Sequence, residues 1–205
     1  MTKFNYKVNE RGNASVELVS FYGKGEEQTV VPSVEEHIVV PSMIDGYVVD
    51  EILENGLNIC ESSLSIYVPK TVTRIGNNAF QYCINAIIYF ESAEFGYNES
   101  MHGGDAPTAY FGINENNLFR DEKYDYILKN DGTALIAHYN SGESKIVVPT
   151  EIKVNGKAYK VTELGEAAFE NPNIWDAEEV VIPSSVKVVS DNVFNRLENA
   201  VITRI

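Results

Sequence analysis

The chain has 205 residues, of which 16 are basic and 30 acidic, and its formal net charge at pH 7 is −14. Such an acidic surface repels phosphate backbones and anionic lipid headgroups, which argues against nucleic-acid binding and against membrane-surface binding. Hydrophobic residues make up 44% of the chain and charged residues 22%, a composition typical of a folded globular protein. No apolar run approaches the roughly 20 residues that a spanning helix needs, so we expect no membrane insertion.

The N-terminal stretch, MTKFNYKVNERGN, lacks the apolar core of a signal peptide. Two locations therefore stay open. The protein is cytoplasmic if Met1 is its native start, and extracellular or at the cell surface if the sequence belongs to a longer exported protein.

Residues 4–18, FNYKVNERGNASVEL, predict a β-hairpin, because alternating apolar residues flank a turn at Arg11-Gly12. The same pattern returns at residues 124–138, YDYILKNDGTALIAH, with its turn at Asp131-Gly132. Further on, NAII at 85–88 matches NAVI at 199–202. The sequence therefore predicts two copies of one unit, each opened by a hairpin.

A shorter repeat lies within each copy, and equivalent apolar residues recur at a constant spacing. In the first copy the matched pairs are Val49 with Val72, Ile52 with Ile75, Leu57 with Phe80, and Cys60 with Cys83. In the second copy Val161, Leu164, Ala168 and Phe169 recur as Val186, Val189, Val193 and Phe194. Such a spacing predicts stacked coils whose equivalent side chains line up into continuous apolar rows.

Each coil contains a strand-like run that ends in proline, namely HIVVP, LSIYVP, KIVVP or EVVIP. The stretches GNNAF and GEAAF predict a tight turn into a short helix, with Asn77 or Glu166 near the helix start. The predicted fold is therefore a β-rich α/β solenoid of strand–turn–short-helix coils, with neighbouring strands ~4.8 Å apart.

Residues 91–123 separate the two copies and are rich in glycine, asparagine and aromatic residues. We expect PTAYFGI to add a strand and Gly103-Gly104 to form a mobile turn. The predicted organisation is 1–90 for the first hairpin and coils, 91–123 for the joining insertion, and 124–205 for the second hairpin and coils. The whole is expected to form one continuous solenoid.

The stretch VPKTVTRIGNNAFQYC, followed by a strand ending in proline, resembles the BspA-type leucine-rich repeat family. VPTEIKVNGKAYKVTELGEAAF is similar to the expanded first coil that follows a hairpin in such proteins. The resemblance implies a solenoid with a curved strand face, in a family of often surface-exposed bacterial or protozoan proteins associated with adhesion or protein binding. It implies no catalytic, metal-binding or cofactor-binding residues.

Cys60 and Cys83 occupy the same repeat position, so stacking would make them neighbours. The favoured interpretation is that both are buried small hydrophobes. A disulfide and a reactive thiol are the alternatives. The three histidines, His37, His102 and His138, form no spaced ligand pair. We expect His138 to be a surface or half-buried strand residue, and His102 to be a weak candidate for a loop site with Asp105.

Four residues are candidate contacts for a protein partner: Ser65, Tyr67, Tyr89 and Trp175. The first three are expected to be exposed on the strand face. Trp175 lies in NPNIWDAEE, a connection longer than its equivalent in the first copy. It is either a binding anchor or a plug for the gap that the longer connection leaves.

The functional hypothesis is a non-enzymatic module that mediates protein–protein interaction, including adhesion, through its strand face and the insertion at 91–123. The acid excess favours a partner with a basic or neutral patch. The alternative is a structural spacer within a larger cell-surface protein, with no binding of its own. The sequence does not identify the partner or the oligomeric state.

Overall fold

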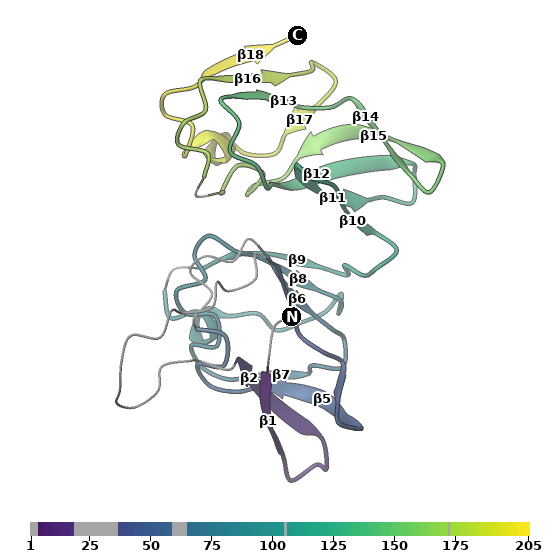
Figure 1. Ribbon diagram of the computed structural model, residues 1–205, viewed down its shortest axis with the longest axis vertical. Helices are drawn as coiled ribbons and strands as arrows, with labels where there is room; N and C mark the ends of the chain where they lie inside the picture. Colours follow the sequence, from purple (N-terminus) through teal and green to yellow (C-terminus); the bar gives the residue numbers. More distant parts are fainter. Residues whose placement is uncertain (1–3, 19–36, 59–64, 105, 172) are drawn as a thin grey trace. The chain divides into compact units, whose positions relative to one another are not determined.

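The structure is a computed structural model that describes residues 4–18, 37–58, 65–104, 106–171 and 173–205 (Figure 1). The chain divides into two compact units, Met1–Gly112 and Ile113–Ile205, and each is described by itself. The division falls within the predicted insertion. None of the helices among the described residues is long and apolar enough to cross a membrane.

The described residues of the first unit form two sheets. The strands are β1 (Phe4–Val8), β2 (Ala14–Leu18), β3 (His37–Val39), β4 (Met43–Ile44), β5 (Tyr47–Ile52), β6 (Ser65–Val68), β7 (Arg74–Ile75), β8 (Ile87–Phe90) and β9 (Thr108–Phe111). One sheet has the order β1-β2-β5-β4, with β7 also paired to β5. The other has the order β3-β6-β8-β9 and is parallel throughout.

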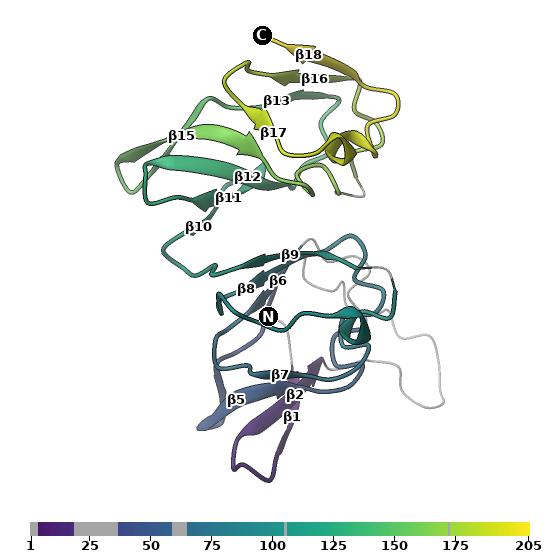
Figure 2. The same ribbon diagram turned by 180° about the vertical axis from the view of Figure 1, so that it is seen from behind.

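The second unit repeats this arrangement. Its strands are β10 (Leu118–Arg120), β11 (Tyr124–Leu128), β12 (Thr133–Tyr139), β13 (Lys145–Val147), β14 (Glu151–Val154), β15 (Lys157–Leu164), β16 (Glu179–Ile182), β17 (Lys187–Val188) and β18 (Val201–Arg204). One sheet has the order β10-β11-β12-β15-β14, with β17 on β15, and the other is the parallel sheet β13-β16-β18. Figures 1 and 2 show β13, β16 and β18 side by side, with β18 at the outer edge of its sheet.

Stacking of equivalent side chains holds each unit together, as the repeat predicts. Ile38, Ile66 and Ile88 lie opposite one another on β3, β6 and β8, and all three are fully buried. In the second unit Ile146, Val180 and Ile202 form the same row on β13, β16 and β18. Because a single coil cannot bury its apolar face alone, these rows are what make the coils one folded body. The solenoid prediction is confirmed.

Both predicted hairpins are present. β1 pairs antiparallel with β2, and Gly12 in their turn has φ +76°. β11 pairs antiparallel with β12, and Gly132 has φ +81°. A positive φ is accessible to glycine without a steric penalty, which is why glycine stands at both turns.

The predicted short helices are wrong. GNNAF and GEAAF form turns, and the regular helices in the described residues are two single 3-10 turns, η1 (Glu99–Met101) and η2 (Asp191–Phe194). The physical reason is that polar backbone groups of these turns bond to the next coil. The Ala79 carbonyl accepts from the Leu57 amide at 2.9 Å, and the Phe80 amide donates to the Met101 carbonyl at 2.8 Å. An α-helix would need those groups for its own i→i−4 bonds.

In the first unit the strand register pairs Ile52 and Ile75 as the repeat predicts. In the second unit the register differs from the predicted pairing at one position. Ile52 lies opposite Ile75, as expected from the sequence. Leu164, however, lies opposite Val188 and not opposite Val189. Val189 is consequently exposed instead of joining the core. The spacing returns to the expected value at Phe169 and Phe194, whose rings stack with centroids 6.3 Å apart.

The insertion contributes to both units. Thr108–Phe111 forms β9, which confirms the predicted strand, and Leu118–Arg120 forms β10 in the second unit. Its aromatic residues pack onto the end of the first unit: the Phe95 and Phe111 rings stack on the Phe90 ring at 4.9 Å and 5.2 Å. Gly103 and Gly104 have positive φ in a turn, and the mobility of that turn stays a prediction.

Candidate partner-binding site

The outer face of sheet β3-β6-β8-β9 carries three of the candidate contacts. Val39, Tyr67, Tyr89 and Tyr110 lie opposite one another on the four strands, in the row next to the buried isoleucines. Since successive side chains of a strand point to opposite faces, this row points away from the core. Val39 is exposed, Tyr67 is half-buried and Tyr89 is fully buried.

The expected exposure of Ser65 and Tyr89 is therefore wrong. Tyr89 lies between Tyr67 and Tyr110 in the register, and the Tyr110 ring stacks on it with centroids 6.0 Å apart. Ser65 is buried, and its Oγ is 2.9 Å from Nδ1 of His37 on β3. Strand neighbours on both sides cover these two residues. Reading single strands from the sequence could not show this, because it did not establish which side chains of the neighbouring strands lie against Ser65 and Tyr89.

The outer face of sheet β13-β16-β18 is more open and was not identified from the sequence. Val147 on β13 is 55% exposed and Val201 on β18 is 65% exposed. Between them Lys145 pairs with Glu179 at 2.6 Å. The alternation within KIVV and EVVI was the signal that could have identified this face. It presents β-branched side chains beside a single ion pair, which suits contact with another protein.

Trp175 is 54% exposed in the turn that precedes β16. More than half of the side chain is therefore accessible, whereas Ile174 and Ala177 beside it are buried, and this exposure argues against the packing alternative. The Arg196 guanidinium lies over the indole, 5.7 Å from the ring centroid. Arg196 Nε in turn donates to Glu170 Oε2 at 2.7 Å. The indole is thus exposed and supported by a cation that is itself held in place.

The cysteine and histidine candidates that the structure describes are buried side chains. Cys83 is a buried free thiol whose Sγ lies 3.2 Å from the Leu57 carbonyl oxygen, so it forms no disulfide here. Cys60 and Asp105 lie outside the described residues. His102 is buried, and its Nδ1 accepts weakly from the Gly104 amide at 3.4 Å. In the part of the chain that the structure describes, no three His, Cys, Asp or Glu side chains gather as metal ligands would.

His138 is fully buried, which corrects the expected surface position. It belongs to a polar cluster on the hairpin β11–β12: Nδ1 lies 2.8 Å from Oδ1 of Asn140, and the amide of Asn140 donates to Asp125 at 2.8 Å. Arg120 binds the same carboxylate through two nitrogens. Sequence alternation placed His138 on the outer side of its strand but could not show the buried polar chain that it joins.

Two pKa shifts follow from this cluster. Burial disfavours the protonated imidazole and lowers the pKa of His138, despite the nearby carboxylates of Asp125 and Glu170. Burial also opposes ionisation of Asp125, but the hydrogen bonds from Arg120 and Asn140 outweigh it and lower the pKa of that carboxyl. The cluster therefore holds a neutral histidine beside an ionised aspartate.

A second polar cluster fastens the first hairpin to β5. The nearly buried Asp50 carboxylate accepts from Arg11 Nε at 2.7 Å, from Asn13 at 2.9 Å and from Asn9 at 2.8 Å. The Arg11 hydrogen bond holds the pKa of Asp50 well below its usual range. All three donors lie in the turn between β1 and β2, so this aspartate orders that turn.

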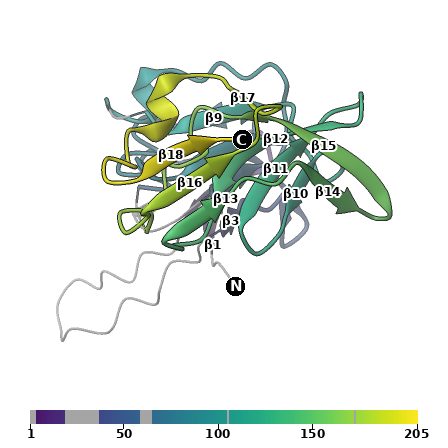
Figure 3. The same ribbon diagram turned by 90° about the horizontal axis from the view of Figure 1, so that it is seen from above.

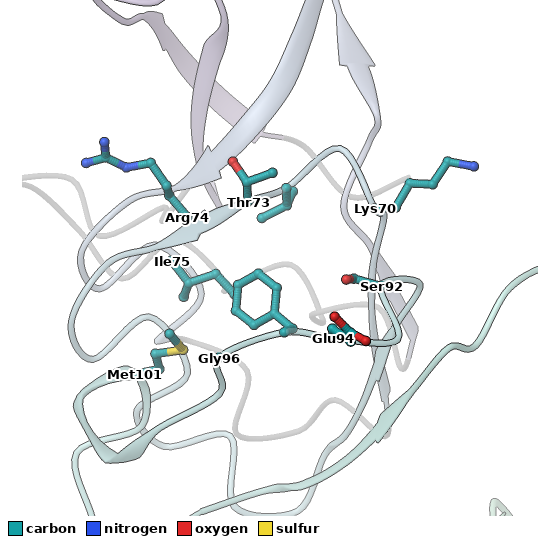
Figure 4. Close-up of a pocket in the computed structure, with 10 residues that line it drawn as sticks. Lys70, Thr73, Arg74, Ile75, Ser92, Glu94, Gly96 and Met101 are labelled. Carbon is teal, nitrogen blue, oxygen red and sulfur yellow. The ribbon is translucent and has the colours of Figure 1, made fainter.

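A pocket of about 400 Å³ lies beside β7 in the first unit (Figure 4). Val72, Ile75, Phe95 and Met101 give it apolar walls, and Lys70, Arg74 and Glu94 are at its rim. Figure 4 shows the side chains of Lys70 and Arg74 extending in opposite directions, away from the centre. They pair instead with Glu91 at 3.4 Å and with Glu51 at 3.5 Å. Thr73 and Ser92 contribute hydroxyl groups to the lining.

The stacked coils, the parallel strand ladders and the short turns between them define a leucine-rich repeat solenoid. The sequence profile of the BspA type leucine-rich repeat region matches six copies, over residues 45–97 and 148–202. The matched residues are more than half of the chain. The chain belongs to the BspA-type leucine-rich repeat family.

Three solved structures are similar to the chain. A leucine-rich repeat protein from Bacteroides capillosus is 25% identical over 43% of this chain, with a TM-score of 0.35, and the match spans 65% of that protein. The T. pallidum leucine-rich repeat protein is 17% identical over 98% of this chain and 68% of its own, with a TM-score of 0.33. A leucine rich cell surface protein from Faecalibacterium prausnitzii is 12% identical over 100% of this chain and 94% of its own, with a TM-score of 0.29. Comparison with curated proteins gave no match.

Proposed function

We propose that the chain is a non-enzymatic module that binds a protein partner, with Trp175 as an anchor of the contact. The exposed indole carries the proposal. Tryptophan is enriched among the residues whose truncation costs most binding energy, and an indole already held in position loses little conformational freedom on binding. Arg196 and Glu170 provide that positioning.

The strand face and the insertion add to the proposed surface. Val147 and Val201 offer exposed apolar contacts on sheet β13-β16-β18, and Phe111 is partly exposed at the end of β9. Tyr67 remains a candidate contact, whereas Ser65 and Tyr89 are buried and can contribute only if their surroundings rearrange. The net charge of −14 favours a partner whose contacting patch is basic or neutral.

The family supports an interaction role, because its members are generally interaction or surface modules. The burial of two reactive side chains also favours binding over catalysis. The Cys83 thiol is fully buried with its Sγ 3.2 Å from the Leu57 carbonyl oxygen, and the imidazole of His138 is fully buried as well, so neither is accessible to a substrate.

The test compares three baits: the native chain, Trp175→Ala, and Ile84→Ala as the matched control. Ile84 is an apolar side chain of the first unit that is 48% exposed, close to the exposure of Trp175. Quantitative mass spectrometry of captured proteins identifies a candidate partner, which is then purified and its dissociation constant measured. We expect Trp175→Ala to weaken binding by at least about tenfold and Ile84→Ala to leave it unchanged.

Urea unfolding of each bait shows whether it is folded. Equal affinity of all three folded baits would contradict the role of Trp175. Failure of the native chain to retain any protein above a bare support would favour the alternative, a structural spacer with no binding of its own.

A further inference from the structure

The hairpin between β14 and β15 is longer than its counterpart between β4 and β5 in the first unit. The Val49 amide closes the first of these hairpins by donating to the Ser42 carbonyl at 2.9 Å. The Val161 amide closes the second in the same way, by donating to the Thr150 carbonyl at 2.9 Å. Eight residues span the first hairpin between these closing residues, and twelve span the second. Figure 3 shows the longer hairpin, in light green, projecting past the other strands of the second unit.

The greater length is accompanied by a reversal of charge. Residues 42–51 of the first unit contain three acidic residues and no basic residue, so their net charge is −3. The equivalent residues 150–163 contain two glutamates and three lysines, Lys153, Lys157 and Lys160, so their net charge is +1. The hairpin is therefore a basic surface on a chain whose net charge is −14.

The three lysines of this hairpin are exposed and carry no ion pair. Lys153, Lys157 and Lys160 are all exposed to solvent. In the part of the chain that the structure describes, none of the three lies within ion-pair distance of a carboxylate, although Lys129 nearby pairs with Glu163 at 2.8 Å. Their charges are thus available to a partner.

The hairpin holds these charges on a rigid frame. Its turn, Asn155-Gly156, has φ +50° and φ +81°, the left-handed conformation that two-residue hairpin turns favour. Val154 and Tyr159 pack against the core of the unit. Nζ of Lys157 lies over the Tyr159 ring, 4.6 Å from its centroid, and this contact leaves the charge in place. A surface that is already ordered loses little conformational freedom on binding.

We propose that the β14–β15 hairpin binds an acidic segment of a partner protein through Lys153, Lys157 and Lys160. Charge complementarity selects this occupant, because carboxylates are the groups that three exposed ammonium groups without ion pairs attract. The inference uses none of the residues proposed above, and it requires a partner patch of the opposite charge. It therefore goes beyond the function proposed for Trp175.

The size of the basic surface favours a short protein segment over an extended polyanion. A nucleic acid or a sulfated polysaccharide carries negative charge along its whole length. Beyond the hairpin it would approach the acidic remainder of the chain, within the screening length of about 8 Å at physiological salt. A segment whose carboxylates are confined to the hairpin avoids this repulsion.

The test starts from a library of short random peptides displayed on phage and selected against the full chain. A chain of net charge −14 should retain basic peptides if only its overall charge matters. We expect in addition a class of retained peptides enriched in aspartate and glutamate. The most enriched acidic peptide is synthesised with a fluorescent label, and its dissociation constant is measured by anisotropy.

Two variants locate the binding surface. The hairpin variant carries Lys153→Gln, Lys157→Gln and Lys160→Gln. The control variant carries three substitutions of exposed lysines elsewhere with the same change in net charge: Lys7→Gln, Lys70→Gln and Lys123→Gln.

We expect the hairpin variant to bind the acidic peptide at least about tenfold more weakly, and the control variant to change affinity by less than about twofold. Raising the salt concentration from about 50 mM to about 300 mM should weaken binding of the native chain at least about threefold. Urea unfolding shows whether each variant is folded. The single variant Lys157→Gln, with an expected loss of about threefold, replaces the hairpin variant if that one is not.

Absence of an acidic class among the retained peptides would overturn the proposal, and so would equal losses in the hairpin and control variants. Heparin tests the other class of partner. Saturable heparin binding that depends on the three lysines, without a lysine-dependent acidic peptide, would also overturn the proposal and assign the hairpin to a polysaccharide. The Trp175→Ala chain should bind the acidic peptide as the native chain does, so that failure here and failure of the Trp175 proposal can be told apart.

Discussion

The rings of Phe169 and Phe194 stack with their centroids 6.3 Å apart and an interplanar angle of 28°. Twenty-five residues separate them in the sequence, and they occupy the same position of two successive coils. This contact is the stacking of the solenoid in its simplest form, because each ring is buried only when the next coil is present.

Phe169→Ala should therefore destabilise the chain strongly. Removing a fully enclosed aromatic ring leaves a cavity between coils, and we expect a loss of about 3–5 kcal/mol in the free energy of unfolding. Urea denaturation measures it. Val147→Ala is the control, since an exposed valine should change stability by less than about 0.5 kcal/mol. Similar losses in the two variants would argue against the aromatic stack.

Gly76→Ala should also destabilise the chain, for a different reason. A Cβ at this position would collide with the backbone nitrogen and Cα of Glu54 in the preceding coil. The backbone must shift to accommodate it, at a cost of about 1–3 kcal/mol. Gly96→Ala is the matched control, because a Cβ there would meet open space. The comparison of the two urea midpoints is decisive, and equal midpoints would contradict the close approach of the coils.

Acidification should lower the stability of the folded chain through protonation of His138 in the unfolded state. Burial lowers its pKa below the value of about 6.5 that an unfolded chain shows, so the unfolded state binds the proton first. The stability contributed by this histidine is present above that value and is lost as the pH falls below it. We expect the native chain to lose more stability between about pH 7.5 and about pH 5.5 than His138→Gln does. Parallel pH profiles would show that His138 does not titrate in this way.

Asp50→Asn tests whether the Asp50 carboxylate on β5 stabilises the turn between β1 and β2. The amide keeps the shape of the side chain but loses the negative charge and one of the two oxygens that accept from Arg11, Asn9 and Asn13, which should cost about 1–3 kcal/mol. The pKa of Asp50 is lowered on folding, so its stabilisation is present above about pH 4 and disappears as the pH falls. The variant should therefore show a shallower acid loss than the native chain. An unchanged acid slope would be evidence against this role.

Trp175 is the one tryptophan of the sequence, so fluorescence excited selectively in tryptophan reports on it alone. Arg196→Gln removes the cation from its ring and the ion pair to Glu170. We expect faster local motion of the indole, seen as a lower time-resolved anisotropy, with little change in global stability because the indole is largely exposed. An anisotropy equal to that of the native chain would show that Arg196 does not position the indole.

The sequence by itself determined the coil and its repetition. Apolar residues at constant spacing predicted the rows of Ile52 with Ile75 and of Phe169 with Phe194, because residues that must be buried in every coil recur wherever the coil recurs. Glycine at 12 and 132 predicted both hairpins, since the turns need a positive φ. These are local or periodic properties, and the family could be identified from them.

Only the tertiary structure decided which side chains remain accessible. Tyr89 was expected at the surface because its strand alternates, yet Tyr67 and Tyr110 flank it and it is buried. His138 is likewise enclosed, and Trp175 is exposed although Ile174 and Ala177 nearby in the sequence are buried. The predicted helices failed because backbone groups of the turns bond to the neighbouring coil. Burial and hydrogen-bond partners depend on segments distant in the chain, and a single strand or turn does not encode what will cover it.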